Sequence, residues 1–188
     1  PRQVPTEGIS GVALADVAYA ESCNRKIKLL GRAVKREDGR ICAYVAPHLV
    51  DSQAPLAGVE DVFNAIMVKG DAIGDVMFYG RGAGKLPTAS AVVADVMDAA
   101  RHIRSRKRIE WGPGGDDVVV SPEEMSFRWY VRARGAAETA RAVPGASLLS
   151  RPGAPADEVA FLTGSMTRAQ LAGALEALTV QSVFRVLE

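Results

Sequence analysis

The spacing of apolar and polar residues predicts short helices and strands from the first residues onward. Helical spacing predicts a first helix that Ser10 caps and Asn24 ends, with its apolar stripe at Val12, Leu14, Val17 and Ala20. Two strand-forming runs flank Asp38-Gly39, a pair of residues typical of a β-hairpin turn. Between residues 41 and 46 neither face of the second strand is strongly polar, so we expect that sheet to be covered on both faces.

A second pair of strands and a longer helix follow. Residues 62–80 predict two strands around a turn at Asp71 to Gly74, and Pro87 suits the first turn of the next helix. The apolar positions of this helix have the spacing of a narrow stripe that faces a sheet: Val92, Val96, Ala99 and Ile103. The first domain, residues 1–110, is therefore predicted to be a mostly antiparallel sheet with helices packed on it.

The second domain, residues 118–188, follows a linker that reads "WGPGGDD". Its first strand is predicted to have one wetter face, because Phe127, Trp129 and Val131 alternate with Arg128, Tyr130 and Arg132. A later helix is capped by Thr167 and has its stripe at Leu171, Leu175 and Leu178. The order β-α-β-β-α-β predicts a split βαβ sandwich, so the chain as a whole is assigned to the α+β class.

Composition and charge remove several classes of function. The chain has 188 residues, is 48% hydrophobic and 24% charged, and has a net charge of +1, which argues against a dedicated nucleic-acid-binding protein. No apolar run approaches the ~20 residues of a membrane span, and the chain does not open on a signal segment. The basic run "RHIRSRKRIE" is explained by nucleic-acid contact or, more simply, by a solvated helix end. Cys23 and Cys42 lack metal or redox spacing, which predicts free thiols in a reducing cytoplasm.

The usual catalytic groups are scarce. The chain contains two histidines and lacks a cluster with ligand spacing, so we expect no metal site. His48 follows Pro47 and is interpreted as a core or turn residue, and His102 lies among arginines at a helix end. Lys28 alternates with apolar neighbours as a solvent-facing strand residue does. No catalytic residue is therefore assigned.

One short stretch does indicate a ligand. In "GRGAG" three glycines alternate with single residues, and such a run indicates that another group approaches closely. A P-loop is excluded, because Leu86 stands where Ser or Thr is needed and Tyr79 where the first glycine is needed. The dinucleotide-binding fingerprint is excluded because Lys85 occupies the place of its third glycine. The turn either meets a ligand in another way or only reverses the chain.

Several separated motifs resemble one enzyme family. The segments are "EGISGVALADVAYAESCNRKIKLLGRAVK", "VAPHLV" and "PLAGVEDVFNAIMVKGDAIGDVMFYGRGAGKLPTASAVVADV". In this order they resemble the later part of homoserine dehydrogenase over about residues 5–104. Asn24 departs from the pattern, since the family usually has glycine there. The second domain resembles the ACT regulatory domain of bacterial members, on the order of its elements.

This resemblance implies an activity and an assembly. The family interconverts aspartate 4-semialdehyde and homoserine with NAD(P), on the path to threonine, isoleucine and methionine, and its members form homodimers. Its Rossmann domain, catalytic lysine and most of its substrate-binding acids precede the "EGI" motif, with which this chain begins. We therefore expect a C-terminal fragment that is inactive by itself and does not bind the cofactor tightly.

The resemblance also assigns the glycine turn. It implies that the turn approaches the nicotinamide end of the cofactor, with contacts at Gly82, Ala83, Gly84 and Thr88. An amino-acid effector such as threonine is not expected to bind strongly, because the turn at Gly135 lacks the proline and register of ligand-binding members. The alternative is a free-standing amino-acid-sensing regulatory protein, which the reading frame upstream of Pro1 would distinguish. A nucleotide-phosphate binder is disfavoured, because the glycine turn matches neither the P-loop nor the dinucleotide-binding fingerprint.

Overall fold

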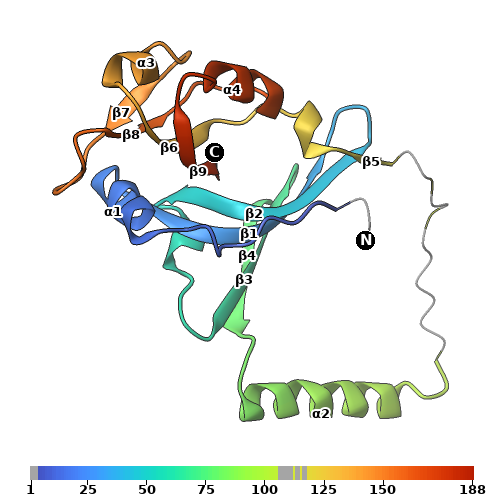
Figure 1. Ribbon diagram of the computed structural model, residues 1–188. Helices are drawn as coiled ribbons and strands as arrows, with labels where there is room; N and C mark the ends of the chain where they lie inside the picture. Colours follow the sequence, from blue (N-terminus) through green and yellow to red (C-terminus); the bar gives the residue numbers. More distant parts are fainter. Residues whose placement is uncertain (1–3, 106–111, 113–114, 116–117) are drawn as a thin grey trace. The chain divides into compact units, whose positions relative to one another are not determined.

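The computed structural model describes residues 4–105, 112, 115 and 118–188 (Figure 1). The chain divides into two compact units. Unit 1 combines the residues up to Gln53 with Gly115–Glu188, and unit 2 is Ala54–Gly114. This division differs from the predicted domains 1–110 and 118–188, because the beginning of the chain packs with its last seventy or so residues.

Unit 1 is a mixed α+β unit built on one sheet. Its elements in chain order are α1 (Leu14–Ser22), β1 (Arg25–Lys35), β2 (Ile41–Asp51), β5 (Val119–Val120), the 3-10 turn η2 (Pro122–Glu124), β6 (Trp129–Arg134), α3 (Ala137–Arg141), β7 (Ser147–Leu149), β8 (Glu158–Leu162), α4 (Arg168–Ala174) and β9 (Thr179–Val186). The predicted Asp38-Gly39 hairpin joins β1 to β2, and Gly39 has the positive φ of 82° that such a turn requires. Asn24 ends the first helical segment with a φ of 55°, as predicted.

The sheet order is β1-β2-β9-β6-β8-β7, with β5 beside β2. Neighbouring strands are antiparallel except for β2 with β9 and β2 with β5, which are parallel. The later elements follow the predicted order β6-α3-β7-β8-α4-β9. The register pair His48↔Arg185 belongs to the short ladder that joins the first part of the chain to the last strand.

Apolar side chains form a core on each face of this sheet. One cluster lies with α3 and α4 and includes Trp129 and Val131 of β6, and the other lies with α1 and includes Tyr130. Because successive strand residues point to opposite faces, one strand supplies both cores. Tyr44 and Leu49 of β2 divide between the two clusters in the same way. The expectation that this sheet is covered on both faces is therefore met along β2.

Three local predictions for unit 1 were wrong. The predicted apolar stripe of the first helix is not buried as a whole, because Leu14 and Val17 are 88% and 37% exposed. The face of β6 that carries Tyr130 and Arg132 is not wetter, since these residues are 0% and 8% exposed. The helix α1 packs on that face and excludes water from it. Ser10 does not cap α1, because the helix begins at Leu14 and the carboxylate of Asp16 accepts a hydrogen bond from the main-chain N–H of Ala13 at 2.8 Å. The stripe of Leu171, Leu175 and Leu178 is buried as predicted, and Thr167 caps its helix.

Unit 2 is a β-hairpin followed by a helix. It contains the 3-10 turn η1 (Pro55–Gly58), β3 (Phe63–Gly70), β4 (Gly74–Arg81) and α2 (Lys85–Arg101). The strands pair antiparallel from Phe63↔Arg81 to Gly70↔Gly74, around the predicted turn. No residue of α2 is buried, so the described residues do not show the expected packing of its apolar stripe on a sheet. Most of the basic run after Arg101 lies outside the described residues.

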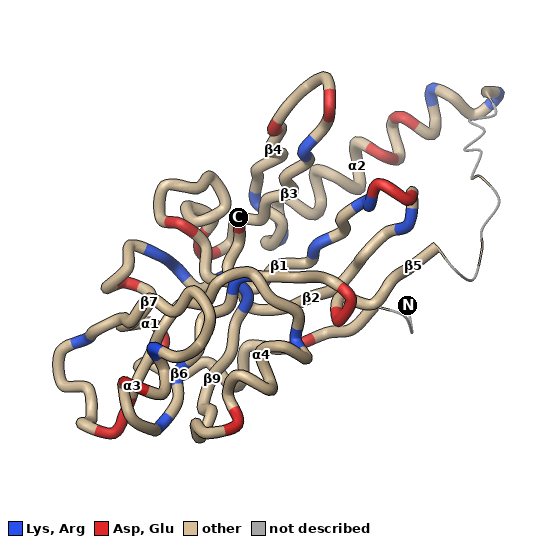
Figure 2. The backbone as a smooth tube through the Cα atoms, turned by 90° about the horizontal axis from the view of Figure 1, so that it is seen from above, with Lys and Arg blue, Asp and Glu red and all other residues tan. Residues whose placement is uncertain are grey.

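Charged residues of both signs follow one another along the described chain (Figure 2). In the part of the chain that the structure describes, no helix has both the length and the apolar character to cross a membrane.

His48 is a buried titratable group on β2. Its side chain is fully buried, Nδ1 lies 2.9 Å from the carbonyl oxygen of Ala46 and Nε2 lies 3.3 Å from the hydroxyl of Tyr44. In the neutral ring Nδ1–H donates to Ala46, so Nε2 accepts from Tyr44. Burial lowers the pKa of His48 to about 4, and the charges of Arg32 and Arg185 act in the same direction, while the hydrogen bond to Ala46 and the charge of Glu7 oppose it.

We predict an acid-dependent loss of stability from this residue. The unfolded chain takes up a proton near pH 6.5 and the folded chain only near pH 4. Between these values the unfolded state binds more protons, so stability is full above pH 6.5 and falls as the pH decreases toward 4, by about 3 kcal/mol. Urea unfolding of wild-type chain and His48→Gln at a series of pH values measures this, and the variant should have a shallower slope in that window.

His102→Gln is the matched control, since the side chain of His102 is 47% exposed. Its ion pair with Asp98 is solvent-exposed and contributes little to stability, so this variant should stay close to the wild type in the same measurement. Equal slopes for His48→Gln and the wild type would contradict the assignment of this acid sensitivity to His48.

Candidate functional site

The glycine turn lies between β4 and α2, where the strand ends at Arg81 and the helix begins at Lys85. Gly84 is the residue before the helix, with φ 119° and ψ 151°. This backbone region is open in practice only to glycine, and another residue there costs about 1–3 kcal/mol of strain. The N–H of Thr88 donates to the carbonyl oxygen of Gly84 at 3.2 Å and so forms the first helical hydrogen bond. The backbone conformation of Gly84 therefore determines where α2 begins.

Gly82 is required for a different reason. A Cβ at Gly82 would lie 1.6 Å from Nδ2 of Asn64, so the amide of Asn64 occupies the space that any side chain would need. The N–H of Gly82 donates to the carbonyl oxygen of Val62 at 3.3 Å. Phe63 and Tyr79 stack with ring centroids 4.9 Å apart beneath this end of the hairpin. The contacts of Gly82 with Asn64 and Val62 therefore fix the turn to the hairpin.

The turn has the chemistry of a main-chain binding site. Gly82, Ala83 and Gly84 follow one another, Thr88 lies in the first turn of α2, and all four residues are exposed. The first N–H groups of a helix have no intrahelical acceptor, and the helix dipole favours a partial negative charge there. A turn of this kind can present main-chain hydrogen-bond donors to a ligand that approaches closely.

Asn64 is the residue of this site that sequence reasoning missed. The signal was available, because counting outward from the Gly70↔Gly74 pair places Asn64 opposite Gly80 in the hairpin register. The reach of its amide to Gly82 is a side-chain property that register alone does not give.

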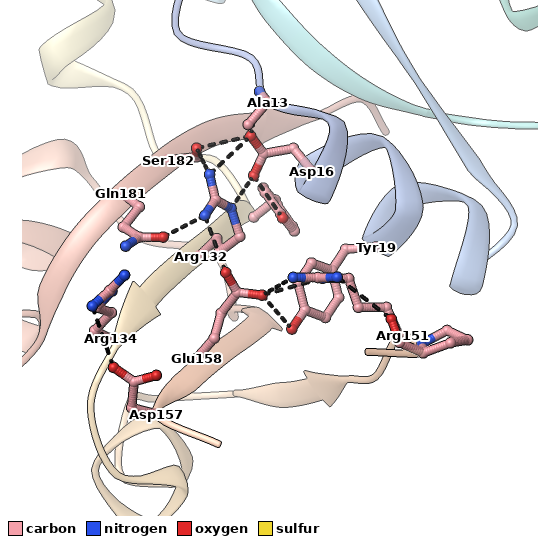
Figure 3. Close-up of polar contacts among 12 residues, drawn as sticks. Ala13, Asp16, Tyr19, Arg132, Arg134, Arg151, Asp157, Glu158, Gln181 and Ser182 are labelled. Carbon is pink, nitrogen blue, oxygen red and sulfur yellow. Dashed lines mark hydrogen bonds and ion pairs between the residues drawn. The ribbon is translucent and has the colours of Figure 1, made fainter. Parts of the chain in front are cut away.

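A cluster of polar side chains lies inside unit 1, between α1 and the sheet (Figure 3). Its centre is the pair of Asp16 on α1 and Arg132 on β6, with Nε of Arg132 2.6 Å from Oδ1 of Asp16. Asp16 is fully buried and Arg132 is 8% exposed. Tyr130 donates its hydroxyl proton to Asp16 at 2.9 Å, and Ser182 on β9 does so at 2.9 Å.

Arg132 uses all of its donors. Nε and Nη2 bind Asp16, Nη2 also binds Ser182, and Nη1 binds Glu158 and Gln181. The β6–β9 register shifts at Arg132, which indicates a β-bulge in β9. A bulge places an additional residue opposite one residue of the partner strand, and here Gln181 and Ser182 both reach the guanidinium. Because the carboxylate of Asp16 and the guanidinium of Arg132 are fully occupied, we interpret the pair as structural and not reactive.

Glu158 extends the cluster to the loop before β8. Its carboxylate accepts hydrogen bonds from Nη2 of Arg151 at 2.6 Å and from the hydroxyl of Tyr19 at 3.2 Å. Burial by itself would raise the pKa of Glu158, but these hydrogen bonds and the one from Arg132 hold the pKa below its usual value. Burial, followed by the neighbouring charge of Asp16, raises the pKa of the Tyr130 hydroxyl. Negative and positive side chains alternate through the cluster, in the order Asp16, Arg132, Glu158 and Arg151.

The described part of the chain contains neither a metal-binding cluster nor an activated thiol. No group of three or more His, Cys, Asp or Glu there is placed to hold a metal ion. Cys23 and Cys42 are free cysteines, and burial raises the pKa of both thiols.

Comparison with known proteins identifies the family. The sequence model described as homoserine dehydrogenase matches residues 1–97, which is just over half of the chain and includes the glycine turn. This chain belongs to the homoserine dehydrogenase family. A homoserine dehydrogenase of Pseudomonas aeruginosa is 48% identical over 100 residues, covering 53% of this chain and 23% of the relative. One from Neisseria gonorrhoeae is 36% identical over 153 residues, covering 77% and 35%.

Solved structures agree with the sequence relatives. A homoserine dehydrogenase from Thiobacillus denitrificans superposes with a TM-score of 0.82 at 29% identity, over 100% of this chain and 48% of that one. A homoserine dehydrogenase from S. aureus gives a TM-score of 0.74 at 30% identity, again over 48% of its length. The chain thus spans about a third or less of these two sequence relatives and about half of the two solved chains.

We predict that the Asp16–Arg132 pair is essential for the stability of unit 1. Asp16→Ala should lower the free energy of unfolding by about 3–5 kcal/mol, because it leaves the buried charge of Arg132 without its partner. The double variant Asp16→Leu with Arg132→Met should be more stable than Asp16→Ala, since it removes both charges. Urea unfolding monitored by circular dichroism measures both.

The control is Arg134, two residues further along β6 and also drawn in Figure 3. Its Nη1 lies 3.5 Å from Oδ2 of Asp157, and the two side chains are 61% and 59% exposed. Arg134→Ala should therefore change stability by no more than about 0.5 kcal/mol. A loss in Asp16→Ala as small as in this control would refute the proposed role.

Proposed function

We propose that this chain is the substrate-domain and C-terminal part of a homoserine dehydrogenase, a cytoplasmic enzyme. The enzyme interconverts aspartate 4-semialdehyde and homoserine with NAD(P) in the biosynthesis of threonine, methionine and isoleucine. The observation that carries this proposal is the family match over residues 1–97, which includes the glycine turn. The chain by itself is expected to be inactive.

The glycine turn is proposed to contact the nicotinamide end of the cofactor. The residues fit such a group, because Gly84 has a backbone conformation that residues with a Cβ rarely adopt, and no side chain caps the N-terminus of the helix that follows. Nicotinamide carries a carboxamide whose oxygen accepts hydrogen bonds from such donors. Gly82 and Ala83 shape the approach, and Thr88 lies in the first turn of α2.

Three buried polar residues of unit 1 are not assigned a proton-transfer role in this proposal. His48 is fully buried and its pKa is lowered to about 4, so it is neutral and inaccessible at neutral pH. Asp16 and Arg132 are saturated by their own hydrogen bonds. The hydride carrier and the proton-transfer group are therefore assigned to the remainder of the proposed enzyme.

The segment from β6 to β9 is proposed to be an ACT-like domain. The proposal is supported by the element order and by the antiparallel sheet order β9-β6-β8-β7. Gly135, in the turn after β6, has a φ of 152°, and a Cβ there would lie 2.4 Å from Cδ2 of Leu178. Core packing thus accounts for this glycine, and we expect no strong binding of an amino-acid effector at that turn.

The proposed enzyme is a homodimer that uses the face of the β3–β4 hairpin on which Ile66 and Phe78 lie. Ile66 and Phe78 form a register pair on that face and are 67% and 64% exposed, and Val68 beside them is 47% exposed. A second copy of the same face is the proposed partner, because exposed apolar patches of this kind mark interaction sites.

We predict that Phe78→Asp shifts the chain from dimer to monomer, since a carboxylate would be buried in the interface without a partner. Light scattering at micromolar concentration measures the mass. Leu14→Asp on α1, at a position that is 88% exposed, should leave the mass unchanged. A wild-type chain that is already monomeric would contradict the homodimer.

For the full-length enzyme we predict that Gly84→Ala reduces kcat/KM for the cofactor. A side chain at Gly84 either meets the nicotinamide or displaces the turn, and a displacement near 1 Å can cost on the order of 100-fold in rate. Steady-state kinetics with NAD(P)H and aspartate 4-semialdehyde measure this. The 188-residue chain alone serves as the inactive blank.

Gly74→Ala is the matched control. Gly74 also has a positive φ, of 71°, but it lies in the turn at the other end of the hairpin, and a Cβ there meets nothing within 4 Å. Both variants carry backbone strain, so similar losses of melting temperature are expected. If Gly84→Ala retained the cofactor kinetics of Gly74→Ala, the glycine turn would have no role at the cofactor.

A further inference from the structure

A small groove between α4 and β9 has no role in the proposed reaction. Its volume is about 290 Å³, near the lower limit for ligand pockets, which suits a short ligand. Apolar side chains dominate the lining, which consists of Arg168, Leu171, Ala172, Leu175, Val180 and Val183. Arg168 is the only charged residue among them.

Arg168 has an unused hydrogen-bond donor. Its Nη1 is buried and, among the described residues, donates no hydrogen bond. The nearest carboxylate oxygen in an ion pair with it is Oε1 of Glu7, at 3.9 Å, which is too long for a hydrogen bond. Glu7 is instead bound by Arg185, whose Nη1 lies 2.9 Å from the same oxygen. The positive charge of Arg168 is therefore only weakly compensated within the chain.

The position of Arg168 is defined by packing. Its guanidinium carbon lies 5.4 Å from the ring centroid of the buried Trp129, a distance at which a cation is attracted to the ring face. A guanidinium at the edge of an apolar groove forms a site with two parts, one for hydrocarbon and one for an anion. Carboxylates are preferred partners of arginine, because both oxygens accept its paired N–H donors.

We propose that this groove binds a small apolar monocarboxylate. The hydrocarbon part lies against Leu171, Leu175 and Val183, and the carboxylate binds the accessible part of the Arg168 side chain, which is 41% exposed although its Nη1 is buried. The lining contains neither Asp nor Glu, and the nearby carboxylate of Glu7 is already bound by Arg185, so the ammonium group of an amino acid would lack an unpaired carboxylate there. The proposed ligand class is thus a branched or straight short-chain acid that lacks an amino group.

Three compounds with one carbon skeleton test the proposal on the 188-residue chain. Isocaproate is the acid, isocaproamide is its neutral isostere, and leucine is the same acid with an ammonium group. Titrations followed by methyl NMR should show isocaproate binding with a dissociation constant of about 1 mM or below. The shifts should be confined to the leucine and valine methyl groups of the groove, and the amide and leucine should each bind at least about tenfold more weakly.

Two variants separate the two parts of the site. Arg168→Gln should weaken isocaproate binding at least about tenfold and leave the amide unchanged. Ala172→Phe, at an exposed position of α4 that lines the groove, should abolish binding of the acid by filling the space. Arg141→Gln on α3, at a side chain that is 62% exposed, is the charge-matched control and should bind like the wild type.

Equal binding of acid and amide, or of acid and leucine, would overturn the proposed ligand class. Shifts outside the groove, or no binding at about 20 mM isocaproate, would overturn the site itself. These outcomes do not depend on dehydrogenase activity, so the site and the proposed function can fail separately.

Discussion

The structure of unit 1 depends on one buried ion pair, between Asp16 near the beginning of the chain and Arg132 in its later half. Two charges removed from water are expensive, and they are tolerated only if their hydrogen-bonding capacity is satisfied. Here α1, β6, β8 and β9 each contribute a partner, so the pair fixes the position of four elements at once. The carboxylate of Asp16 also binds the N–H of Ala13 and so determines where α1 begins.

This constraint explains why the chain does not divide at the linker. The pair Asp16–Arg132 lies on one face of the sheet, and on the other face Arg185 of β9 stacks on Tyr44 of β2 and is paired with Glu7. Residues from the first fifty positions and from the last seventy thus complete each other on both faces. The later half of the chain is therefore needed to complete the fold of unit 1, whether or not it also binds a ligand.

The glycine turn of unit 2 obeys local rules instead. Its shape follows from the conformation of Gly84 and from the space that Asn64 takes beside Gly82, both set within the hairpin and the first turn of α2. A site of this kind supplies main-chain donors and a close approach, and it contains no acid or base. This fits the proposed contact with a cofactor whose reactive chemistry other parts of the proposed enzyme supply.

The sequence by itself determined the features that depend on neighbours in the chain. These include the two hairpins, the α+β class, the order of the last six elements, the Thr167 cap and the family, because turn residues and periodicity act over a few positions. Tertiary structure decided which strands joined into one sheet and which polar residues were buried. Arg132 looks solvent-facing in the alternating pattern of β6, and only the packing of α1 on that face buries it with Asp16. Alternation assigns residues to a face, but what covers that face depends on segments more than a hundred residues away.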